Sequence, residues 1–328
     1  MPLIGSRASL VINAKSSEYR NYREKLISRF WNYKQARFGT EESLFEQEDN
    51  PQARVPVFSK SAAGWNVLIA PDATEEKRRQ VLAQLPKASR HRWFRSMTST
   101  QALVQSIFGN LKAYDSVHLL KGLVDDQGLP LFDTAVLTAE NVSMGHPLTI
   151  LNEPVPASID IFLSGPFRIA VQCALMEQDA GKCSSVTWGH CNGSYAVQMG
   201  SQERCYLTDK GLRYWEYIPM VFSWGGNVNH SPCPLQNNFQ LVRRIFSASV
   251  GPDGKLSPKR GHAILLYDDR NPAFRKGGKG FEAYESIRAA LRYPTLLRKC
   301  SWQRLIEHMR SRSALPWLTV ELEKKYGL

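Results

Sequence analysis

The chain has 328 residues, of which 43% are hydrophobic, so it is long enough to form one large domain or two small ones. It carries 42 Lys and Arg against 30 Asp and Glu, a formal net charge of +12 that favours a polyanionic partner, nucleic acid first. No apolar run approaches the roughly 20 residues of a membrane span, and the N-terminus lacks the apolar stretch of a signal peptide. We therefore expect a cytoplasmic protein with no membrane segment.

Residues 1–87 are interpreted as an N-terminal helical extension and linker. Within them, residues 17–38 carry aromatic and aliphatic side chains at helical spacing, which predicts an amphipathic helix. Because this helix is also basic, two interpretations stay open: it packs on the main domain through its aromatic face, or it contacts DNA. Residues 66–70 are expected to form a short strand, and Thr74 to cap a helix that ends near Leu85.

The main domain is expected over residues 88–312, followed by a C-terminal tail at 313–328. In chain order, its predicted elements are a helix at 99–111, strands at 131–138, 158–163 and 167–175, a helix at 233–250, a strand at 262–267, and helices at 279–292 and 301–312. Residues 140–149 are expected as a loop, and residues 176–232 as a cysteine-containing insertion with little regular structure. This order predicts an α/β core in which helices cover a mixed sheet.

The two central strands form the stretch S-I-D-I-F-L-S-G-P-F-R-I-A-V-Q-C-A-L, residues 158–175, with a Ser-Gly-Pro turn between them. Asp160 lies inside the first strand, while Gln172 and Ala174 lie two residues apart on the second. Residues two apart on a strand point to the same face of the sheet. We therefore expect Asp160, Gln172 and Ala174 to converge at one end of this hairpin, with Cys173 facing the core.

Several other segments accompany the hairpin in a characteristic order. They are W-F-R-S-M-T-S-T-Q-A-L (93–103), R-I-A-V-Q-C-A-L-M-E (168–177), G-L-R-Y-W (211–215), P-C-P-L (232–235), Q-L-V-R (240–243) and Y-D-D-R-N-P-A-F (267–274), together with the cysteines at 183, 191 and 205. In these segments the chain resembles bacterial restriction-endonuclease-like proteins of the PD-(D/E)XK nuclease superfamily.

The resemblance implies a restriction-endonuclease-like core with the order helix-strand-strand-strand-helix-strand. It also implies metal-dependent phosphodiester hydrolysis with Mg²⁺ or Mn²⁺, and DNA as the partner. The setting that it implies is restriction, anti-phage defence or a mobile element, where the protein acts as a homodimer or with other proteins of such a system. The alternative that we keep is a non-catalytic nucleic-acid-binding or assembly subunit on a degenerate nuclease fold.

Two of the residue types usual in this superfamily are missing here. The resemblance assigns the metal-binding Asp to Asp160, but Gln172 stands where a second acid is usual and Ala174 where a Lys is usual. An amide oxygen can bind a metal without charge, whereas a methyl group cannot stabilise negative charge. Three interpretations stay open: a nuclease inactivated by substitution, a natural degenerate nuclease that binds without cutting, or a site in which Lys182 or an arginine supplies the cation. Ala174 also fits a plain buried core position.

Other residues complete the candidate site. Gln101, on the first core helix, is expected to support the catalytic residues, and Glu153 to be a further Mg²⁺ ligand beside Asp160 and Gln172. Glu177 follows the second hairpin strand, close to the site, and is expected to be solvated. The candidates for nucleic-acid binding are Arg92, Arg95, Gln240, Arg243 and Arg244. For each of these residues, the competing interpretation is an ordinary exposed or helix-packing side chain.

The six cysteines are expected to be reduced or metal-bound, because no secretory signal is present. Four of them, Cys183, Cys191, Cys205 and Cys233, are separated by 7, 13 and 27 residues. They are candidates for a Zn²⁺ site or an iron–sulfur cluster, with His190 or His230 as substitute ligands. Since no C-x-x-C pair supports this interpretation, buried and reduced thiols are the alternative. A Ser-His-Asp hydrolase is disfavoured because the chain has no G-x-S-x-G motif.

Overall fold

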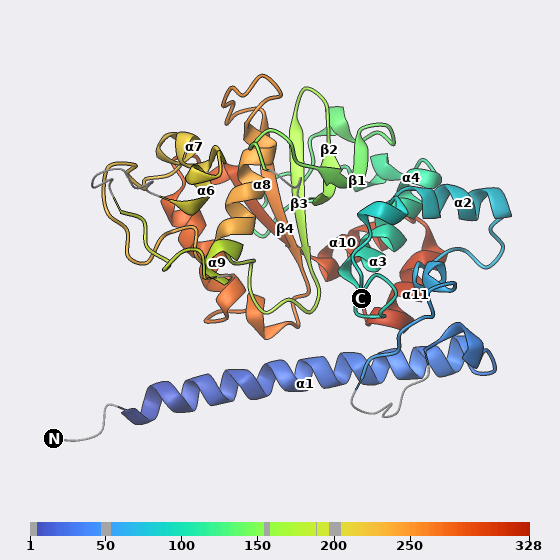
Figure 1. Ribbon diagram of the computed structural model, residues 1–328. Helices are drawn as coiled ribbons and strands as arrows, with labels where there is room; N and C mark the ends of the chain where they lie inside the picture. Colours follow the sequence, from blue (N-terminus) through green and yellow to red (C-terminus); the bar gives the residue numbers. More distant parts are fainter. Residues whose placement is uncertain (1–4, 47–53, 154–157, 188, 197–204) are drawn as a thin grey trace.

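The computed structural model describes residues 5–46, 54–153, 158–187, 189–196 and 205–328 of the chain. A five-stranded mixed sheet lies at its centre (Figure 1). The strands are β1 (Val142–Pro147), β2 (Ser158–Leu163), β3 (Arg168–Ala174), β4 (Gly261–Tyr267) and β5 (Leu297–Ser301), and they are adjacent in that order. Strands β1, β2 and β3 pair antiparallel, whereas β3, β4 and β5 pair parallel.

Helices cover both faces of the sheet. They are α1 (Gly5–Phe38), α2 (Glu75–Ala83), α3 (Thr100–Val104), α4 (Asn110–Ala113), α5 (Ser184–Thr187), α6 (Tyr206–Asp209), α7 (Tyr214–Val221), α8 (Phe239–Ser249), α9 (Lys279–Ala290), α10 (Trp302–Ser311) and α11 (Pro316–Tyr326). A π-helical turn, Gln105–Gly109, joins α3 to α4. The parallel pairs β3–β4 and β4–β5 are connected through α8 and α9, as parallel pairing requires. The predicted order helix-strand-strand-strand-helix-strand is therefore confirmed, but its first strand is β1 and not residues 131–138.

Alternation along the strands divides the apolar side chains between two cores. On β2 and β3, Ile161 and Val171 enter the core that includes α3, α10 and α11, while Phe162 and Ala170 enter the core that includes α7, α8 and α9. Strand β4 has a parallel partner on each side and is buried over almost its whole length, so its sequence H-A-I-L-L-Y reads as a continuous apolar run. The hairpin is thus held between two helical layers.

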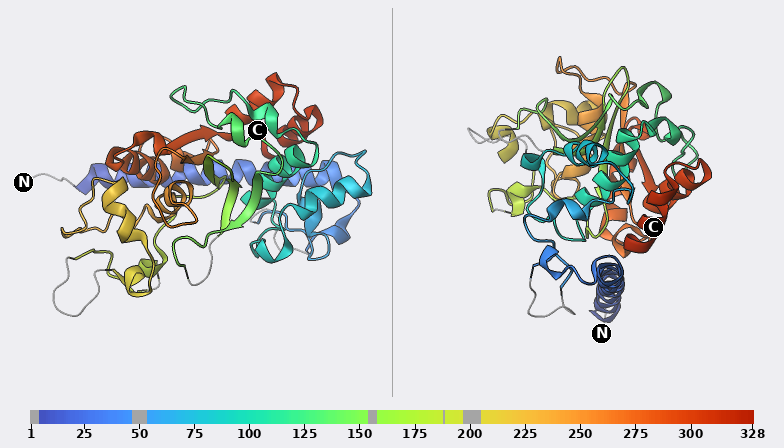
Figure 2. Two further views of the ribbon diagram at one scale, coloured as in Figure 1. Left: turned by 90° about the horizontal axis from the view of Figure 1, so that it is seen from above. Right: turned by 90° about the vertical axis from the view of Figure 1, so that its right-hand side faces the viewer.

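Helix α1 lies lengthwise along one side of the molecule (Figure 2). Its side chains Tyr22, Leu26, Phe30 and Tyr33 are buried, and the ring of Phe30 meets that of Tyr326 in α11 edge-on at 5.6 Å. The aromatic face of the predicted amphipathic helix therefore packs on the main body. A role of its basic face in contacting DNA stays a prediction.

The structure corrects two of the predicted strands. Residues 131–138 form no strand but an irregular segment with the 3-10 turn Thr134–Val136, and the strand that pairs with β2 is β1, in the region expected as a loop. The sequence did not indicate this strand, because it contains Gly145 and Pro147 and these residue types usually mark turns. Gly145 has a φ of +62°. Residues 66–70 also form no strand, since the Asn66 side chain is buried and bonds to Phe94 O and Ser96 O.

The two ends of the chain also differ from prediction. Residues 313–328, expected as a tail, contain α11, whose Leu318, Leu322 and Tyr326 are fully buried in the same core as β3. Strand β5 has the polar sequence L-R-K-C-S, which gave no strand signal. Residues within 1–87, such as Phe58 and Val81, belong to this core as well, so residue 88 marks no independent boundary. Among the described residues, no helix is long and apolar enough to cross a membrane.

Candidate active site

The β2–β3 hairpin places Asp160 opposite Gln172. The last registered pair of these strands is Ile161 with Val171, and Asp160 and Gln172 lie one step beyond it. The strands separate there, and Asp160 Oδ2 accepts a hydrogen bond from the backbone N–H of Cys173 at 2.9 Å. The Cys173 side chain belongs to the core on the other face of the sheet, as predicted. The hairpin therefore presents a carboxylate and an amide side by side.

Both residues line an open cleft of about 530 Å³. The other lining residues come from β2, from the segment after β3, and from α8, and the set is Ser158, Asp160, Gln172, Cys173, Glu177, Gln178, Asp179, Gly181, Gln240, Arg243 and Arg244. We call this the carboxylate cleft. A larger hollow of about 860 Å³ lies between α1 and the segment after β4, but its lining contains one carboxylate, Glu18, among basic and amide groups. The larger hollow lacks paired acids, so the carboxylate cleft is the better candidate for chemistry.

Glu177 is the second carboxylate of the cleft. It is exposed, as expected, yet it is also held in place: Oε1 accepts a hydrogen bond from Thr100 Oγ1 at 2.8 Å, and Oε2 accepts one from Leu175 N at 2.5 Å. Loss of hydration raises the pKa of Glu177, and the negative charge of Asp160 raises it further. Burial also raises the pKa of Asp160, although the positive charge of Arg244 opposes this rise. The negative charge of Asp160 therefore acts on Glu177 across the cleft.

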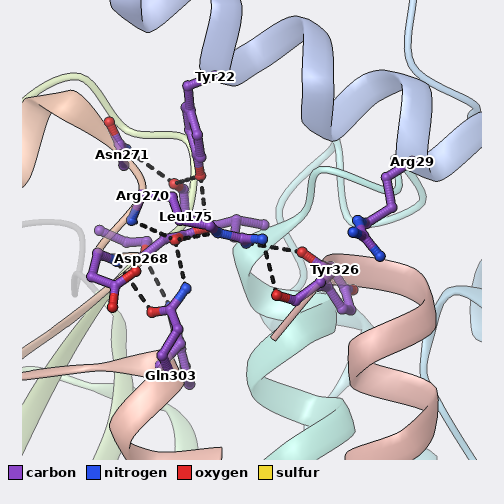
Figure 3. Close-up of polar contacts among 12 residues, drawn as sticks. Tyr22, Arg29, Leu175, Asp268, Arg270, Asn271, Gln303 and Tyr326 are labelled. Carbon is purple, nitrogen blue, oxygen red and sulfur yellow. Dashed lines mark hydrogen bonds and ion pairs between the residues drawn. The ribbon is translucent and has the colours of Figure 1, made fainter.

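Hydrogen bonds from distant parts of the chain hold the segment that carries Glu177. The Tyr22 hydroxyl on α1 donates to Leu175 O at 2.7 Å, and the Tyr19 hydroxyl donates to Met176 O at 2.6 Å. Asn271 Nδ2 lies 3.0 Å from Leu175 O and 2.9 Å from Glu177 O (Figure 3). The exit of the chain from β3 is thus fixed by α1 and by the segment after β4.

A buried carboxylate organises this support. Asp268 is fully buried, and its two oxygens accept hydrogen bonds from Arg270, from Gln303 Nε2 at 2.8 Å and from the Tyr22 hydroxyl at 3.0 Å (Figure 3). The ion pair to Arg270 Nη2 measures 2.6 Å. Arg270 also donates to Tyr326 O and to Gly327 O at the C-terminus. We call Tyr22, Asp268, Arg270 and Gln303 the Asp268 cluster; it explains the Y-D-D-R-N-P-A-F segment as a structural junction.

The cation of the cleft comes from α8 and not from β3. Ala174 is 1% exposed and packs in the core beneath α8, so no Lys function exists at that position. Lys182 is exposed and its Nζ lies 4.0 Å from Asp179 Oδ2. Arg244, by contrast, is 5% exposed, and its Nη2 donates to Ser158 O at 3.2 Å. Among the described residues, Arg244 Nε and Nη1 have no hydrogen-bond partner.

Gln172 is also left partly unpaired. Its Nε2 donates to Ala180 O at 3.1 Å, which orients the amide, while its buried Oε1 has no partner within the described part of the chain. A buried amide oxygen without a donor calls for an explanation, and an ion or water bound in the cleft supplies one. The cleft lining offers three carboxylates, Asp160, Glu177 and Asp179, and the amide oxygen of Gln172. These donors suit Mg²⁺, which prefers oxygen ligands and retains several waters.

Of the other predicted site residues, Glu153 does not line the cleft, whereas those on α8 do. Glu153 forms an ion pair with Arg243 Nε at 2.9 Å and accepts a hydrogen bond from the Tyr214 hydroxyl, so its carboxylate is already occupied and does not line the cleft. Arg243 Nη1 in turn donates to Gln240 Oε1 at 2.9 Å. Gln240, Arg243 and Arg244 therefore do border the cleft, as a polar row along α8.

Gln101 and the two arginines near it lie elsewhere. The Gln101 amide binds His91 N at 2.6 Å and Ser89 O at 3.2 Å, and its neighbour Thr100 contacts Glu177 instead. Arg95 forms an ion pair with Glu46 and donates to Phe58 O. Arg92 is exposed and lies over the ring of Trp93.

The four predicted metal-binding cysteines line a different cavity from the carboxylate cleft. None of the six cysteines, all of which lie in the described residues, forms a disulfide. Within the described residues, no three His, Cys, Asp or Glu side chains stand together as a ready-made metal site.

The five-stranded mixed sheet and its covering helices are those of a restriction-endonuclease-like core. A family model described as "Restriction Endonuclease associating with ARP" matches residues 32–327, almost the whole chain. The chain therefore belongs to this family, and membership indicates a nuclease-type function. No curated protein and no solved structure gives a significant match.

Proposed function

We propose that this protein is a metal-dependent DNA endonuclease that hydrolyses phosphodiester bonds in the carboxylate cleft. The observation that carries the proposal is the meeting, in one cleft, of Asp160 and Glu177 with two incompletely bonded groups, Gln172 Oε1 and the Arg244 guanidinium. Buried polar groups normally find partners inside the protein. In this cleft, Gln172 Oε1 and two nitrogens of Arg244 have no such partner among the described residues. The cleft is therefore suited to bind an anionic ligand together with a cation.

Asp160, Glu177 and the Oε1 atom of Gln172 would hold Mg²⁺ or Mn²⁺. When bound, such an ion polarises a phosphoryl oxygen and supplies hydroxide near neutral pH. Burial raises the pKa of both Asp160 and Glu177, and the charge of Asp160 raises that of Glu177 further, so a bound cation would favour the ionised form of both acids.

Arg244 would take the place of the Lys that is missing at Ala174. A guanidinium remains charged even when burial lowers its pKa, as it does here. Held on α8 at the wall of the cleft, it is placed to stabilise the negative charge that develops on a phosphate during hydrolysis. The interpretation in which an arginine supplies the cation is therefore the one that we propose.

DNA is the proposed substrate. The net charge of +12 supports a polyanionic ligand, and the polar row of Gln240, Arg243 and Arg244 borders the cleft where a backbone would pass. Trp93 is 49% exposed with Arg92 over its ring, which suits contact with an unpaired base. The setting that we propose is bacterial restriction or another defence or mobile-element system, in the cytoplasm.

The test is cleavage of plasmid and single-stranded DNA by the whole protein with Mg²⁺ or Mn²⁺, compared with Arg244→Met and Arg244→Lys. We expect Arg244→Met to lose activity about 100-fold or more, and Arg244→Lys to retain part of it. Arg312→Met, which removes an exposed arginine outside the cleft, is the matched control. Unchanged cleavage by folded Arg244→Met would reject the role of Arg244.

A second candidate function is a nucleic-acid-binding or assembly subunit that does not cut. Two observations favour it: Ala174 is packed in the core where the resemblance places a Lys, and the family description names an association with ARP. Salt-dependent DNA binding by the wild type, with no cleavage in either metal, would select this function.

A further inference from the structure

Four cysteines from distant parts of the insertion meet around one cavity. Cys183, Cys191, Cys205 and Cys233 all line a cavity of about 10 Å³ next to Leu207 and Leu235. This volume is about that of a single water molecule or ion. Their sequence separations are wide, so only the fold brings them together. Neither the proposed nuclease reaction nor the carboxylate cleft uses any of the four.

Backbone N–H groups point at the sulfur atoms in a repeated pattern. Gly193 N lies 3.4 Å from Cys191 Sγ, two residues earlier in the chain. Burial raises the pKa of the Cys205 and Cys233 thiols, and the backbone N–H groups of Leu207 and Thr208 at Cys205 and of Leu235 at Cys233 oppose this rise. A neutral thiol is a weak acceptor, whereas a thiolate gains from several N–H donors. Backbone N–H groups thus lie near three of the four sulfurs, where they would stabilise metal-bound thiolates.

A side-chain donor adds to this pattern. The indole Nε1 of Trp215 is buried and, among the described residues, has no partner at normal hydrogen-bond distance. It acts on the thiol of Cys205, whose pKa it lowers against the larger effect of burial. An unpaired buried N–H beside a cysteine sulfur is stabilised when that sulfur becomes a thiolate.

We propose that Cys183, Cys191, Cys205 and Cys233 bind one Zn²⁺ ion as four thiolates. Four cysteine ligands form the closed tetrahedral arrangement of structural zinc sites. The small cavity favours a single ion, because the bridged irons and sulfides of an iron–sulfur cluster need more room. The thiols of the described structure do not yet stand at ligand distances, so zinc draws the four sulfurs inward and displaces their four protons to solvent.

The site would fasten the insertion to the wall of the carboxylate cleft. Cys183 N donates to Gln236 O at 3.0 Å, and Cys233 N donates to Gly193 O at 2.7 Å, so the cysteines already link the segment after β3 to the segment before α8. The same segment after β3 includes Ala180, whose carbonyl orients Gln172. Zinc would therefore be structural, with all four ligands supplied by protein and no open position for substrate.

The first experiment measures metal in the whole protein, purified without chelators from zinc-supplemented cells. We expect about one equivalent of zinc per chain. Replacement of zinc by Co²⁺ should give the intense visible bands of tetrahedral tetrathiolate cobalt. Purified wild type with no zinc above background, and no such bands after addition of Co²⁺, would overturn the proposal; iron with sulfide in place of zinc would overturn it equally.

Variants assign the ligands. Cys183→Ser should lose most of the bound zinc and shift the cobalt bands, because one thiolate is replaced by a weaker ligand. Cys300→Ser is the matched control, since Cys300 is fully buried and does not line the cavity. Full zinc content in Cys183→Ser would remove that cysteine from the site. The wild-type metal and cobalt measurements remain decisive if a variant fails to fold.

Discussion

Two clusters of charged and polar groups lie near the point where the chain leaves β3, and they differ in how completely their polar atoms are hydrogen-bonded. In the Asp268 cluster, both carboxylate oxygens are saturated by donors from Tyr22, Arg270 and Gln303. In the carboxylate cleft, Asp160 accepts one hydrogen bond from the described residues, Gln172 Oε1 has none, and two nitrogens of Arg244 are unpaired.

This difference in hydrogen bonding distinguishes a cluster that stabilises the fold from a cluster that is suited to bind a ligand. A saturated buried ion pair holds chain segments together, and breaking it is costly. An unsaturated polar cluster reduces stability unless it binds something, so its presence is expected where a ligand completes it. The Asp268 cluster thus holds the chain segment that carries Glu177, and the Glu177 carboxylate lines the carboxylate cleft.

The largest expected effect on stability comes from Asp268→Asn. An amide nitrogen would then face donors from Arg270 or Gln303, and we expect the free energy of unfolding to fall by about 3–5 kcal/mol. Urea unfolding of the variant measures this loss. Asp269→Asn, next in the chain and partly exposed, should lose much less. Equal losses in the two variants would mean that the cluster is not a junction.

Asp160→Asn should reduce DNA cleavage strongly and leave the free energy of unfolding almost unchanged. We expect cleavage to fall about 100-fold or more, while stability without metal is unchanged or higher. The sign follows from the raised pKa of Asp160: the folded state favours the neutral acid, so ionisation above the unfolded pKa costs stability, and an amide removes this cost. Thermal unfolding and a cleavage assay on one preparation test both parts. A strongly destabilised Asp160→Asn would assign Asp160 to the structural class.

Metal should stabilise the cleft selectively. At a Mg²⁺ concentration of about ten times its Kd, binding to the folded state alone raises the free energy of unfolding by about 1.4 kcal/mol. We expect this increase in the wild type and its loss in Asp160→Asn. Unfolding curves with and without Mg²⁺ compare the two proteins. A gain that survives the substitution would place the metal elsewhere.

The smallest expected effect is the change with pH in the free energy of unfolding that is due to the buried side chain of Lys325. Lys325 is fully buried and donates to Asn66 O at 2.6 Å and Asn66 Oδ1 at 2.8 Å, and burial lowers its pKa to about 7. The unfolded chain then binds more protons above that pH, so stability rises with pH. Between roughly pH 6 and pH 8 the gain is about 1 kcal/mol.

The control for this effect is Lys325→Met, in which the contribution should vanish from the pH profile whatever the absolute stability. The difference between the two profiles isolates Lys325 from the other titrating groups. Parallel profiles would show that Lys325 keeps its ordinary pKa.

Much of the local structure follows from sequence. The hairpin at β2 and β3, the helices α9 and α10, and the cap at Thr74 match their predicted positions, because period-2 and helical patterns and capping residues act over a few neighbours. Helix α8 ends where predicted but begins at Phe239, six residues after the predicted start at residue 233. Strand β5 and helix α11 were missed, since a polar strand and a short C-terminal helix are stabilised by packing against distant elements.

For the candidate site, the sequence by itself determined that Asp160 and Gln172 share one end of a hairpin, because strand geometry sets which side chains share a face. It left the cation open between Lys182 and an arginine, and it proposed Glu153 as a ligand. Only the tertiary structure decided that Arg244 and Glu177 line the same cleft as Asp160. It also decided that Glu153 forms an ion pair with Arg243 instead of lining the cleft. Those contacts join α8 and the segment after β3 across long stretches of chain, and no local pattern records which distant side chains will meet.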